Sequence, residues 1–486
     1  MPLPLNPHHE KRWLILAVIG VAQLMVVLDA TIVNIALPSA QRDLGFSDDS
    51  RQWIVTAYAL AFGSLLLLGG RIGDLFGRKW AFIAGLLGFA VASAVGGAAG
   101  SFGVLVAARA AQGAFGALLA PSALALLSTI FTDRDERGKA FGIYGAIAGG
   151  GAAVGLLLGG ILTETLSWRW CLYVNLLFAV PAALAALRLL VNQAQANRPP
   201  IDVPGTLTAT SGLFALVYGF SNSETHSWTH PITIVMLAAS VVLLAAFVWI
   251  ESRVAHPLLP LRVIADRVRG GAYLSIGIAG IAMFAVFLFL TYYLQLTKGF
   301  SPIETGLAFL PMTAAIMVTA TSVNIRFLQR IGPRPLLVLG MVLGSGAMVW
   351  LAQLEPGSSY VGHVLPALLV LGVGLGNIFA PAFATATYGV DPHDTGVASA
   401  MVNTMQQVGG SIGTALLSSI FASAVTSYVE SHPRTPQVLG DAAVHGYTVA
   451  FWIAAGVFAM GAVVVAITMP PIRVATHESA AEPALA

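Results

Sequence analysis

The chain has 486 residues, of which 57% are hydrophobic and 9% charged, and its formal net charge is +2. Soluble domains carry about 25% charged residues, so this composition excludes an ordinary soluble protein and predicts a polytopic membrane protein. The small net charge and scattered basic residues give no indication of nucleic-acid binding. With one cysteine, Cys171, no internal disulfide is possible, and we expect a small packing residue there.

Fourteen apolar runs are long enough to cross a bilayer, which takes about 20 residues of helix. The sequence therefore predicts an all-α polytopic membrane protein with fourteen transmembrane helices. The segment 206–222 is the shortest and is rich in Thr, Ser and Gly. The expected spans are 13–37, 52–69, 80–99, 102–130, 140–163, 170–190, 206–222, 231–250, 270–296, 304–325, 335–353, 362–388, 397–425 and 446–469.

The distribution of Lys and Arg predicts the orientation. If the N-terminus is cytoplasmic, 18 of the 24 basic residues fall on the cytoplasmic side and five on the other, and Arg109 lies inside a span. We therefore expect both termini to be cytoplasmic in a bacterial inner membrane. The first apolar run is too long for a cleaved signal peptide and leads to Pro38 rather than to a small-residue cleavage site.

A weak internal repeat predicts the domain organisation. Segment 71–79 resembles segment 326–334, and each follows the second span of a six-span block if 206–250 is an inserted pair. Two related bundles are the usual consequence of such a repeat. The expected units are a cytoplasmic N-terminus (1–12), a six-helix bundle (13–190), two inserted helices (206–250), a second six-helix bundle (270–469) and a cytoplasmic tail (470–486).

Asp29 lies deep in the first span, where a charged group costs roughly 2.5–3.5 kcal/mol on insertion scales. Arg109 is the only basic residue at similar depth. At about 1.5 Å rise per residue, the two lie about 12 and about 10 Å below the outer boundary, so they can face one another. This pattern favours a proton- or cation-handling site. The alternative is a permanent ion pair that only fixes helix packing.

Glycines in the fifth span recur at four-residue spacing, which lets helices approach closely. They are Gly151, Gly155, Gly159 and Gly160. A packing role and a gating role both fit this spacing.

The short loop from Gly70 to Lys79 joins the second and third spans. Its basic residues fit a topology signal, but Asp74 needs another explanation. We expect Asp74 to bind Arg78 or the N-terminus of a neighbouring helix, where a carboxylate is favourable.

The four lysines test for ATP use, because a P-loop requires the pattern G-x-x-x-x-G-K-[ST]. None of them fits it; they are Lys11, Lys79, Lys139 and Lys298. Energy must then come from an ion gradient, a substrate gradient or a partner. The histidines lie in predicted tails and loops, so we expect no metal site, no cofactor and no intramembrane enzyme.

Five motifs occur in order along nearly the whole chain. They are 29–38 in the first span, 70–79 in the loop, Arg109-Ala-Ala-Gln112-Gly113, Trp168-Arg169-Trp170 with Asn175, and 396–410 with Asn403 and Gln407. Together they resemble the major facilitator superfamily, and within it the fourteen-span drug:proton antiporters of the EmrB/QacA type.

The resemblance implies roles for several positions. Proton coupling or substrate binding would involve Asp29, Asn34, Arg109 and Gln112. A conformational latch controlling alternating access would involve Gly70, Asp74, Gly77, Arg78 and Lys79. The partners implied are protons, the lipid bilayer and a small drug-like molecule. The expected oligomeric state is a monomer.

One departure concerns the fifth span, where Leu156 replaces the proline of the antiporter motif, so that helix lacks a proline-induced kink. The C-terminal half also lacks deeply embedded acids. We therefore expect monovalent lipophilic cations or neutral amphiphiles as exported substrates. Two alternatives stay open: a proton-linked importer of the same fold, and a receptor or an export subunit that needs a partner protein.

Overall fold

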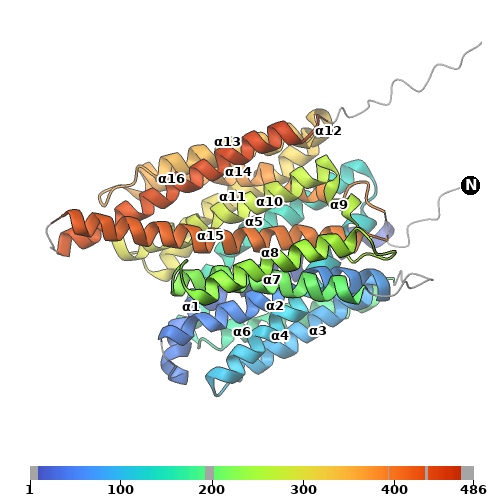
Figure 1. The fold of residues 1–486 in the computed structure, drawn as a ribbon, viewed down its shortest axis with the longest axis horizontal. Coiled ribbons are helices and arrows are strands. Elements are labelled where there is room, and N and C mark those ends of the chain that lie inside the picture. Colours follow the sequence, from blue (N-terminus) through green and yellow to red (C-terminus); the bar gives the residue numbers. More distant parts are fainter. Residues whose placement is uncertain (1–8, 47, 192–201, 392, 433–435, 472–486) are drawn as a thin grey trace, which may run out of the picture.

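The computed structural model describes residues 9–46, 48–191, 202–391, 393–432 and 436–471, and these form helices joined by loops. In this part of the chain thirteen helices are long and apolar enough to cross a membrane, and a bent pair within α5 supplies a fourteenth if it is counted as one span. The helices run in similar directions (Figure 1). The expected all-α architecture with fourteen spans is confirmed, including the shortest span at 206–222, which lies within α7.

The first eight long helices follow one another through short connections. The N-terminal 3₁₀ turn His9–Lys11 precedes them. Their bounds are α1 Arg12–Leu44, α2 Asp48–Phe76, α3 Arg78–Gly97, α4 Phe102–Ile130, α5 Arg134–Thr165, α6 Trp170–Leu189, α7 Val203–Thr225 and α8 Pro231–Glu251.

The remainder of the chain is helical but less regular. Three π-helical turns occur, at Val286–Leu290, Tyr293–Thr297 and Tyr360–Val364. The α-helices are α9 Leu261–Ala265, α10 Arg267–Ala285, α11 Pro302–Arg326, α12 Leu328–Ile331, α13 Pro333–Leu351, α14 Leu365–Ala386, α15 Thr395–Ser431 and α16 Pro436–Thr468.

Packing links the two halves of the chain through a few helices. From the first half, α5 packs on α11 and α14, and α2 packs on α15. Helix α7 packs on α8, α2 and α15, so the inserted pair lies across the front between α15 and α2 (Figure 1). The division into units at 13–190, 206–250 and 270–469 stays a prediction, and residues 1–8 and 472–486 of the predicted terminal segments lie outside the described residues.

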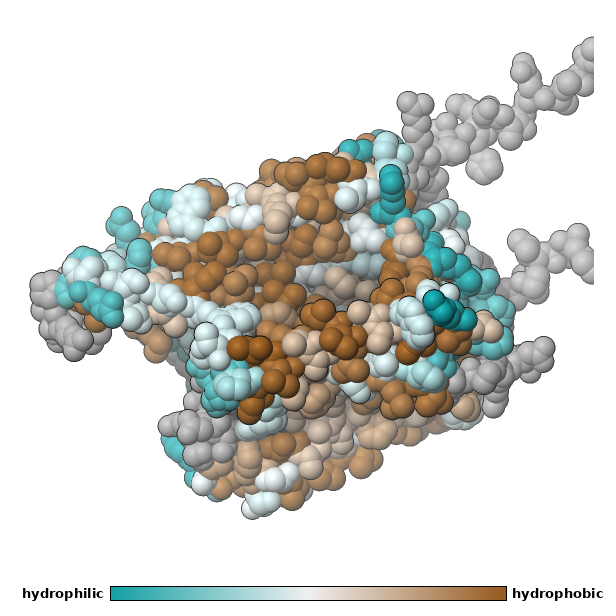
Figure 2. Space-filling model, viewed as in Figure 1, coloured by the Kyte–Doolittle hydropathy of each residue, from teal (hydrophilic) through white to brown (hydrophobic). Residues whose placement is uncertain are grey.

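The surface agrees with a lipid environment. Figure 2 shows brown, hydrophobic residues over the middle of the helices and teal residues near both ends. On α8 large apolar side chains are exposed, including Val241 and Val242, each 68% exposed. We call the end at which α1 begins and α2 ends the basic end, because Arg12, Arg78 and Lys79 lie there.

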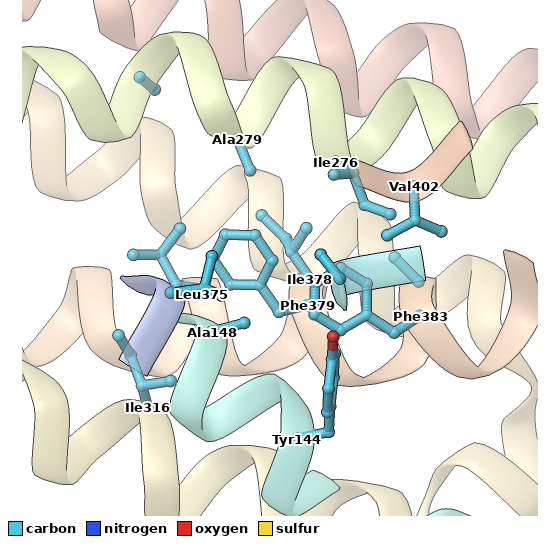
Figure 3. Close-up of a cluster of buried hydrophobic side chains, with 14 of the residues drawn as sticks. Tyr144, Ala148, Ile276, Ala279, Ile316, Leu375, Ile378, Phe379, Phe383 and Val402 are labelled. Atoms are coloured by element: carbon cyan, nitrogen blue, oxygen red, sulfur yellow. The ribbon is translucent and has the colours of Figure 1, made fainter. Parts of the chain in front are cut away.

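A hydrophobic cluster joins α5 to the second half of the chain (Figure 3). Tyr144 of α5 meets Phe383 of α14 edge-on, with ring centroids 5.7 Å apart. A Cβ at Gly149 would lie 3.1 Å from both Ile316 of α11 and Phe379 of α14. The close approach of these three helices therefore depends on a residue without a side chain.

Helix α5 is bent by 47° between its parts at 136–151 and 154–165. It contains no proline, so the loss of the motif proline at Leu156 does not straighten it. The bend lies among glycines, which are a recognised cause of kinks. Gly155 meets α1 so closely that a Cβ would fall 2.1 Å from Thr31 Oγ1 and 3.2 Å from Leu28 O.

The turn of α1 that carries Asp29 thus packs against the row of glycines on α5. A Cβ at Gly151 would lie 2.9 Å from Val27 Cγ1, and one at Gly159 would lie 3.0 Å from Ile32 Cγ1. Gly160 is buried on the same helix. Gly151, Gly155 and Gly159 therefore pack against α1, and the choice between a packing role and a gating role stays a prediction.

We expect Gly155→Val to displace α1, because the new methyl groups would overlap Thr31 and the backbone of Leu28. Overpacking of this kind costs about 1–3 kcal/mol. The measurement is the apparent melting temperature in detergent. Gly456→Val on α16, where a Cβ meets nothing within 4 Å, is the matched control; equal melting temperatures for the two variants would contradict the predicted contact.

Candidate functional site

Asp29 is fully buried on α1 and accepts three hydrogen bonds. Its Oδ2 accepts one from Arg109 Nη1 at 2.5 Å. Its Oδ1 accepts one from Gln112 Nε2 at 2.9 Å and one from Asn175 Nδ2 at 2.7 Å. The structure therefore brings together Asp29, Arg109 and Gln112, which the sequence had singled out, and adds Asn175 of α6.

Arg109 is 1% exposed and is held on several sides. Its Nε donates to Ile54 O of α2 at 3.2 Å, and Nη1 also donates to Gln112 Oε1 at 2.9 Å. The guanidinium lies over the ring of Tyr58, 4.4 Å from its centroid. A cation–π contact with a desolvated guanidinium is favourable, so Tyr58 helps to keep the charge where Asp29 can reach it.

Ser93 of α3 completes the polar cluster. Its Oγ accepts from Gln112 Nε2 at 2.7 Å and from Asn175 Nδ2 at 3.3 Å. The serine thus orients the two amides that donate to Asp29. We name the group Asp29, Ser93, Arg109, Gln112 and Asn175 the carboxylate cage.

Some residues of this site could be recognised in the sequence, and others could not. Arg109 and Gln112 are three residues apart and share one helix face, which makes them recognisable as a pair. Asn175 was visible only as part of a motif, and Ser93 carried no signal beyond a hydroxyl in an apolar run. Asn34 belongs to α1, but its side chain lies outside the described residues.

The cage satisfies the Asp29 carboxylate, which accepts three donors beside a guanidinium. Adding a proton to Asp29 would remove the anionic partner of a buried Arg109. A proton on Asp29 would therefore weaken the contact between the carboxylate and the guanidinium. The arrangement can couple a proton to movement between α1 and α4.

A second group of predicted residues lies at the basic end. Asp74 is 3% exposed, and its Oδ1 accepts from Arg78 Nη2 at 2.9 Å. Both of its oxygens accept from the backbone N–H of Gly396, at 3.1 and 3.0 Å. Because Gly396 is in the first turn of α15, Asp74 binds both partners that the sequence allowed, Arg78 and a helix N-terminus.

Glycine makes this crossing of α2 and α15 possible. A Cβ at Gly70 would lie 2.6 Å from Gly396 O, and one at Gly396 would lie 2.5 Å from Gly70 O. Gly77 has a φ of 100°, which L side chains rarely adopt, and it precedes α3. Lys79 Nζ donates to Leu187 O of α6 at 2.9 Å. We call the contact of Gly70 and Asp74 with Gly396 the α2–α15 latch.

Arg137 makes a further connection that the sequence did not indicate. It donates from Nη1 to Ser128 O of α4 at 3.0 Å and from Nη2 to Thr387 Oγ1 beyond α14 at 2.9 Å. The sequence suggested only a topology signal here, because its partner lies far along the chain. The basic end is therefore joined through α2 to α15 and through α5 to the end of α14.

Comparisons with known proteins agree with this architecture. A sequence profile of the Major Facilitator Superfamily matches residues 19–414. The chain is 50% identical to the puromycin resistance protein pur8 of Streptomyces alboniger over 459 residues, 93% of this chain and 90% of that protein. It is 37% identical to the cephamycin export protein CmcT of Amycolatopsis lactamdurans over 405 residues, 83% of each.

A solved structure shows the same fold at low sequence identity. The crystal structure of the human organic anion transporter MFSD10 (TETRAN) matches with a TM-score of 0.63 and 15% identity, covering 94% of this chain and 99% of that one.

Arg109→Met should lower the apparent melting temperature, because it leaves the buried Asp29 carboxylate without its cation. Breaking a buried ion pair costs about 3–5 kcal/mol, whereas replacing both partners is often nearly neutral. The double variant Asp29→Asn, Arg109→Met should therefore recover most of the loss. A double variant as unstable as the sum of both single variants would show that the two side chains do not act as a pair.

Gly396→Ala should open the α2–α15 latch, because the methyl group would overlap Gly70 O and Asp74. The readout is maleimide labelling of a cysteine introduced at Val397, which is fully buried, as is the native Cys171. We expect this cysteine to be labelled several-fold faster in the Gly396→Ala variant than in the protein that keeps Gly396. Gly410→Ala on the same helix, where a Cβ meets nothing within 4 Å, should leave the rate unchanged; labelling that is equally slow in both variants would count against the latch.

Proposed function

Because the chain belongs to the major facilitator superfamily, we propose that it exports antibiotic-like amphipathic molecules from a bacterial cell in exchange for protons. The family makes the chain a multi-pass membrane transporter. Export is supported by two relatives, one named for puromycin resistance and one for cephamycin export. The 50% identity to the former over nearly the whole chain is the observation that carries this part of the proposal.

The carboxylate cage supports proton coupling. Asp29 is an acid without solvent exposure, and among the described residues Arg109 is the charged group that hydrogen-bonds to it. A proton arriving on Asp29 Oδ2 would replace the bond from Arg109 Nη1. The freed guanidinium keeps Ile54 O and Gln112 Oε1 as acceptors, so it has partners in both states.

The latch supports alternating access. In the arrangement described, Asp74 binds Gly396 and Arg137 binds Thr387, so these contacts join the two halves of the chain at the basic end. We assign the basic end to the cytoplasm, from the distribution of Lys and Arg. Separation of α1 from α4 after proton binding would then be followed by opening of this end, substrate entry and release of the proton inside the cell.

The substrate class follows from the scarcity of acids in the second half. Asp394, which precedes α15, is 4% exposed and is bonded to Arg262 Nη2 at 2.5 Å. Divalent cationic substrates would require further unpaired carboxylates within the membrane-spanning part. Monovalent lipophilic cations or neutral amphiphiles fit better, and a monomer of this fold contains all the residues invoked.

The importer alternative rested on Leu156. Because α5 bends without the motif proline, this substitution no longer favours import over export. The protein would lie in the inner membrane, with both termini in the cytoplasm.

The experiment is proton flux in inside-out vesicles with an acidified lumen. The compounds are puromycin, a monovalent lipophilic cation and its dicationic analogue. Puromycin or the monovalent cation should cause proton release from the lumen, and Asp29→Asn should abolish it because the exchanged proton has no carboxylate to bind. Glu430→Gln, at an exposed position on α15, is the control and should release protons as the parent protein does.

Three results would count against the proposal. Release that survives in Asp29→Asn would move the proton site elsewhere. No release with any compound in the parent protein would reject antiport, and faster release with the dication would reject the substrate class.

A further inference from the structure

We propose that Asp202 and Glu251 form a second proton-binding site, at the base of the inserted helix pair, that controls how firmly this pair supports the α2–α15 latch. Asp202 precedes α7 and Glu251 ends α8, so both lie at the basic end. Only 6% and 5% of their surfaces are exposed. The carboxylate cage does not contact them, and they play no part in the function proposed above.

The two carboxyl groups meet over Gly205. A Cβ at Gly205 would lie 2.1 Å from Asp202 Oδ2 and 2.6 Å from Glu251 Oε1. Both distances start from the same Cβ position, so Asp202 Oδ2 and Glu251 Oε1 are no farther apart than the sum of the two. Asp202 Oδ2 is buried and has no hydrogen-bond donor among the described residues, so it faces the other carboxyl group unpartnered.

Only backbone groups donate to the pair within the described chain. Gly205 N donates to Asp202 Oδ1 at 2.9 Å. The N–H groups of Leu258 and Leu259 donate to Glu251 Oε1 and Oε2 at 3.2 and 3.0 Å. These donors are neutral, so among the described residues no charged group donates a hydrogen bond to the two acids.

Among the described residues, Arg253, Arg262 and Arg78 on the surrounding elements contact other partners. Arg253, just after α8, places its guanidinium 4.7 Å from the centre of the Trp249 ring. On α9, Arg262 binds Asp394 at 2.5 Å. At the start of α3, Arg78 binds Asp74 of α2, which faces α15 through Gly396, and the buried Arg71 lies on α2 three residues before Asp74.

A proton suits this site better than a metal ion. Two carboxylates that share a buried site do not both ionise readily, and one proton held between them removes the repulsion. Hard cations instead require several oxygen ligands. Here three backbone N–H groups point at the carboxylate oxygens. These oxygens therefore act as hydrogen-bond acceptors, which does not favour coordination of a metal ion.

The pair is connected to the latch through the segment 252–260 (Figure 1, between α8 and α9). Leu258 and Leu259, whose N–H groups Glu251 holds, belong to a buried cluster with residues of α2 and α15 that adjoin Gly70 and Gly396. These residues are Leu67, Val397 and Ala400. Beyond the segment, Arg262 binds Asp394 directly before α15.

Proton loss would therefore weaken the latch. With both groups charged, repulsion drives one carboxylate toward water, and the N–H groups of Leu258 and Leu259 lose their acceptor. The two leucines then pack less firmly on α2 and α15. The inserted pair thus adjusts the closure of the basic end according to the pH at that end.

The experiment measures the distance between spin labels on Leu187→Cys of α6 and Ile331→Cys of α12, which are 40% and 46% exposed near the basic end. The buried Cys171 stays in place, and Asp29→Asn is the background so that the cage does not titrate. Raising the pH from about 6 to about 9, a range reached by buried carboxyl groups, should increase the population with long distances at least threefold.

Glu251→Gln should keep the short distance across this range, because the amide retains an acceptor for Leu258 or Leu259 and offers an N–H to Asp202. Asp202→Asn should behave in the same way, since its Oδ1 still accepts from Gly205. Asp266→Asn, at the N-terminus of α10 on the same end, is the control and should keep the pH response.

Three outcomes would overturn the proposal. They are a parent protein without a pH response, a Glu251→Gln variant with an unchanged response, and a response that follows sodium concentration rather than pH. Because no transported compound is present, these outcomes are independent of whether antiport itself is demonstrated.

Discussion

The ion pair between Asp29 and Arg109 is the constraint on which much of the first half of the chain depends. Neither charge is tolerable alone in hydrocarbon, so each needs the other and further hydrogen bonds. The helices α1, α3, α4 and α6 all contribute polar groups to this pair, and α2 contributes Ile54 O and the ring of Tyr58. The requirement that both charges have partners fixes the relative rotations of these helices, and apolar packing alone would not impose it.

Glycine plays the complementary part, because it lets backbones touch where movement is proposed. The contacts of Gly155 with α1 and of Gly70 with Gly396 leave no room for a side chain. At the second contact Asp74 adds a charge that binds the N-terminus of α15. Such contacts depend on charge and shape rather than on buried apolar area, which is little gained between helices in lipid.

Some of the site was predictable because it departs from its surroundings. Asp29 and Arg109 stand out in apolar runs, and helix rise places them at one depth. Ser93 and Arg137 did not stand out, since a lone hydroxyl in a span and a basic residue in a loop are ordinary. Asp202 and Glu251 flank the expected spans 206–222 and 231–250, and only the folded hairpin brings their carboxyl groups together.

The sequence by itself determined how many segments cross the membrane and which charges are embedded, and it predicts their orientation, because hydropathy and the Lys/Arg bias are properties of short windows. The tertiary structure alone decided which side chains meet, since this depends on how each helix is rotated and how closely its neighbours approach. The bend of α5 belongs to this second group: its cause lies in glycines packed against α1, α11 and α14 rather than in a proline that can be read from the motif.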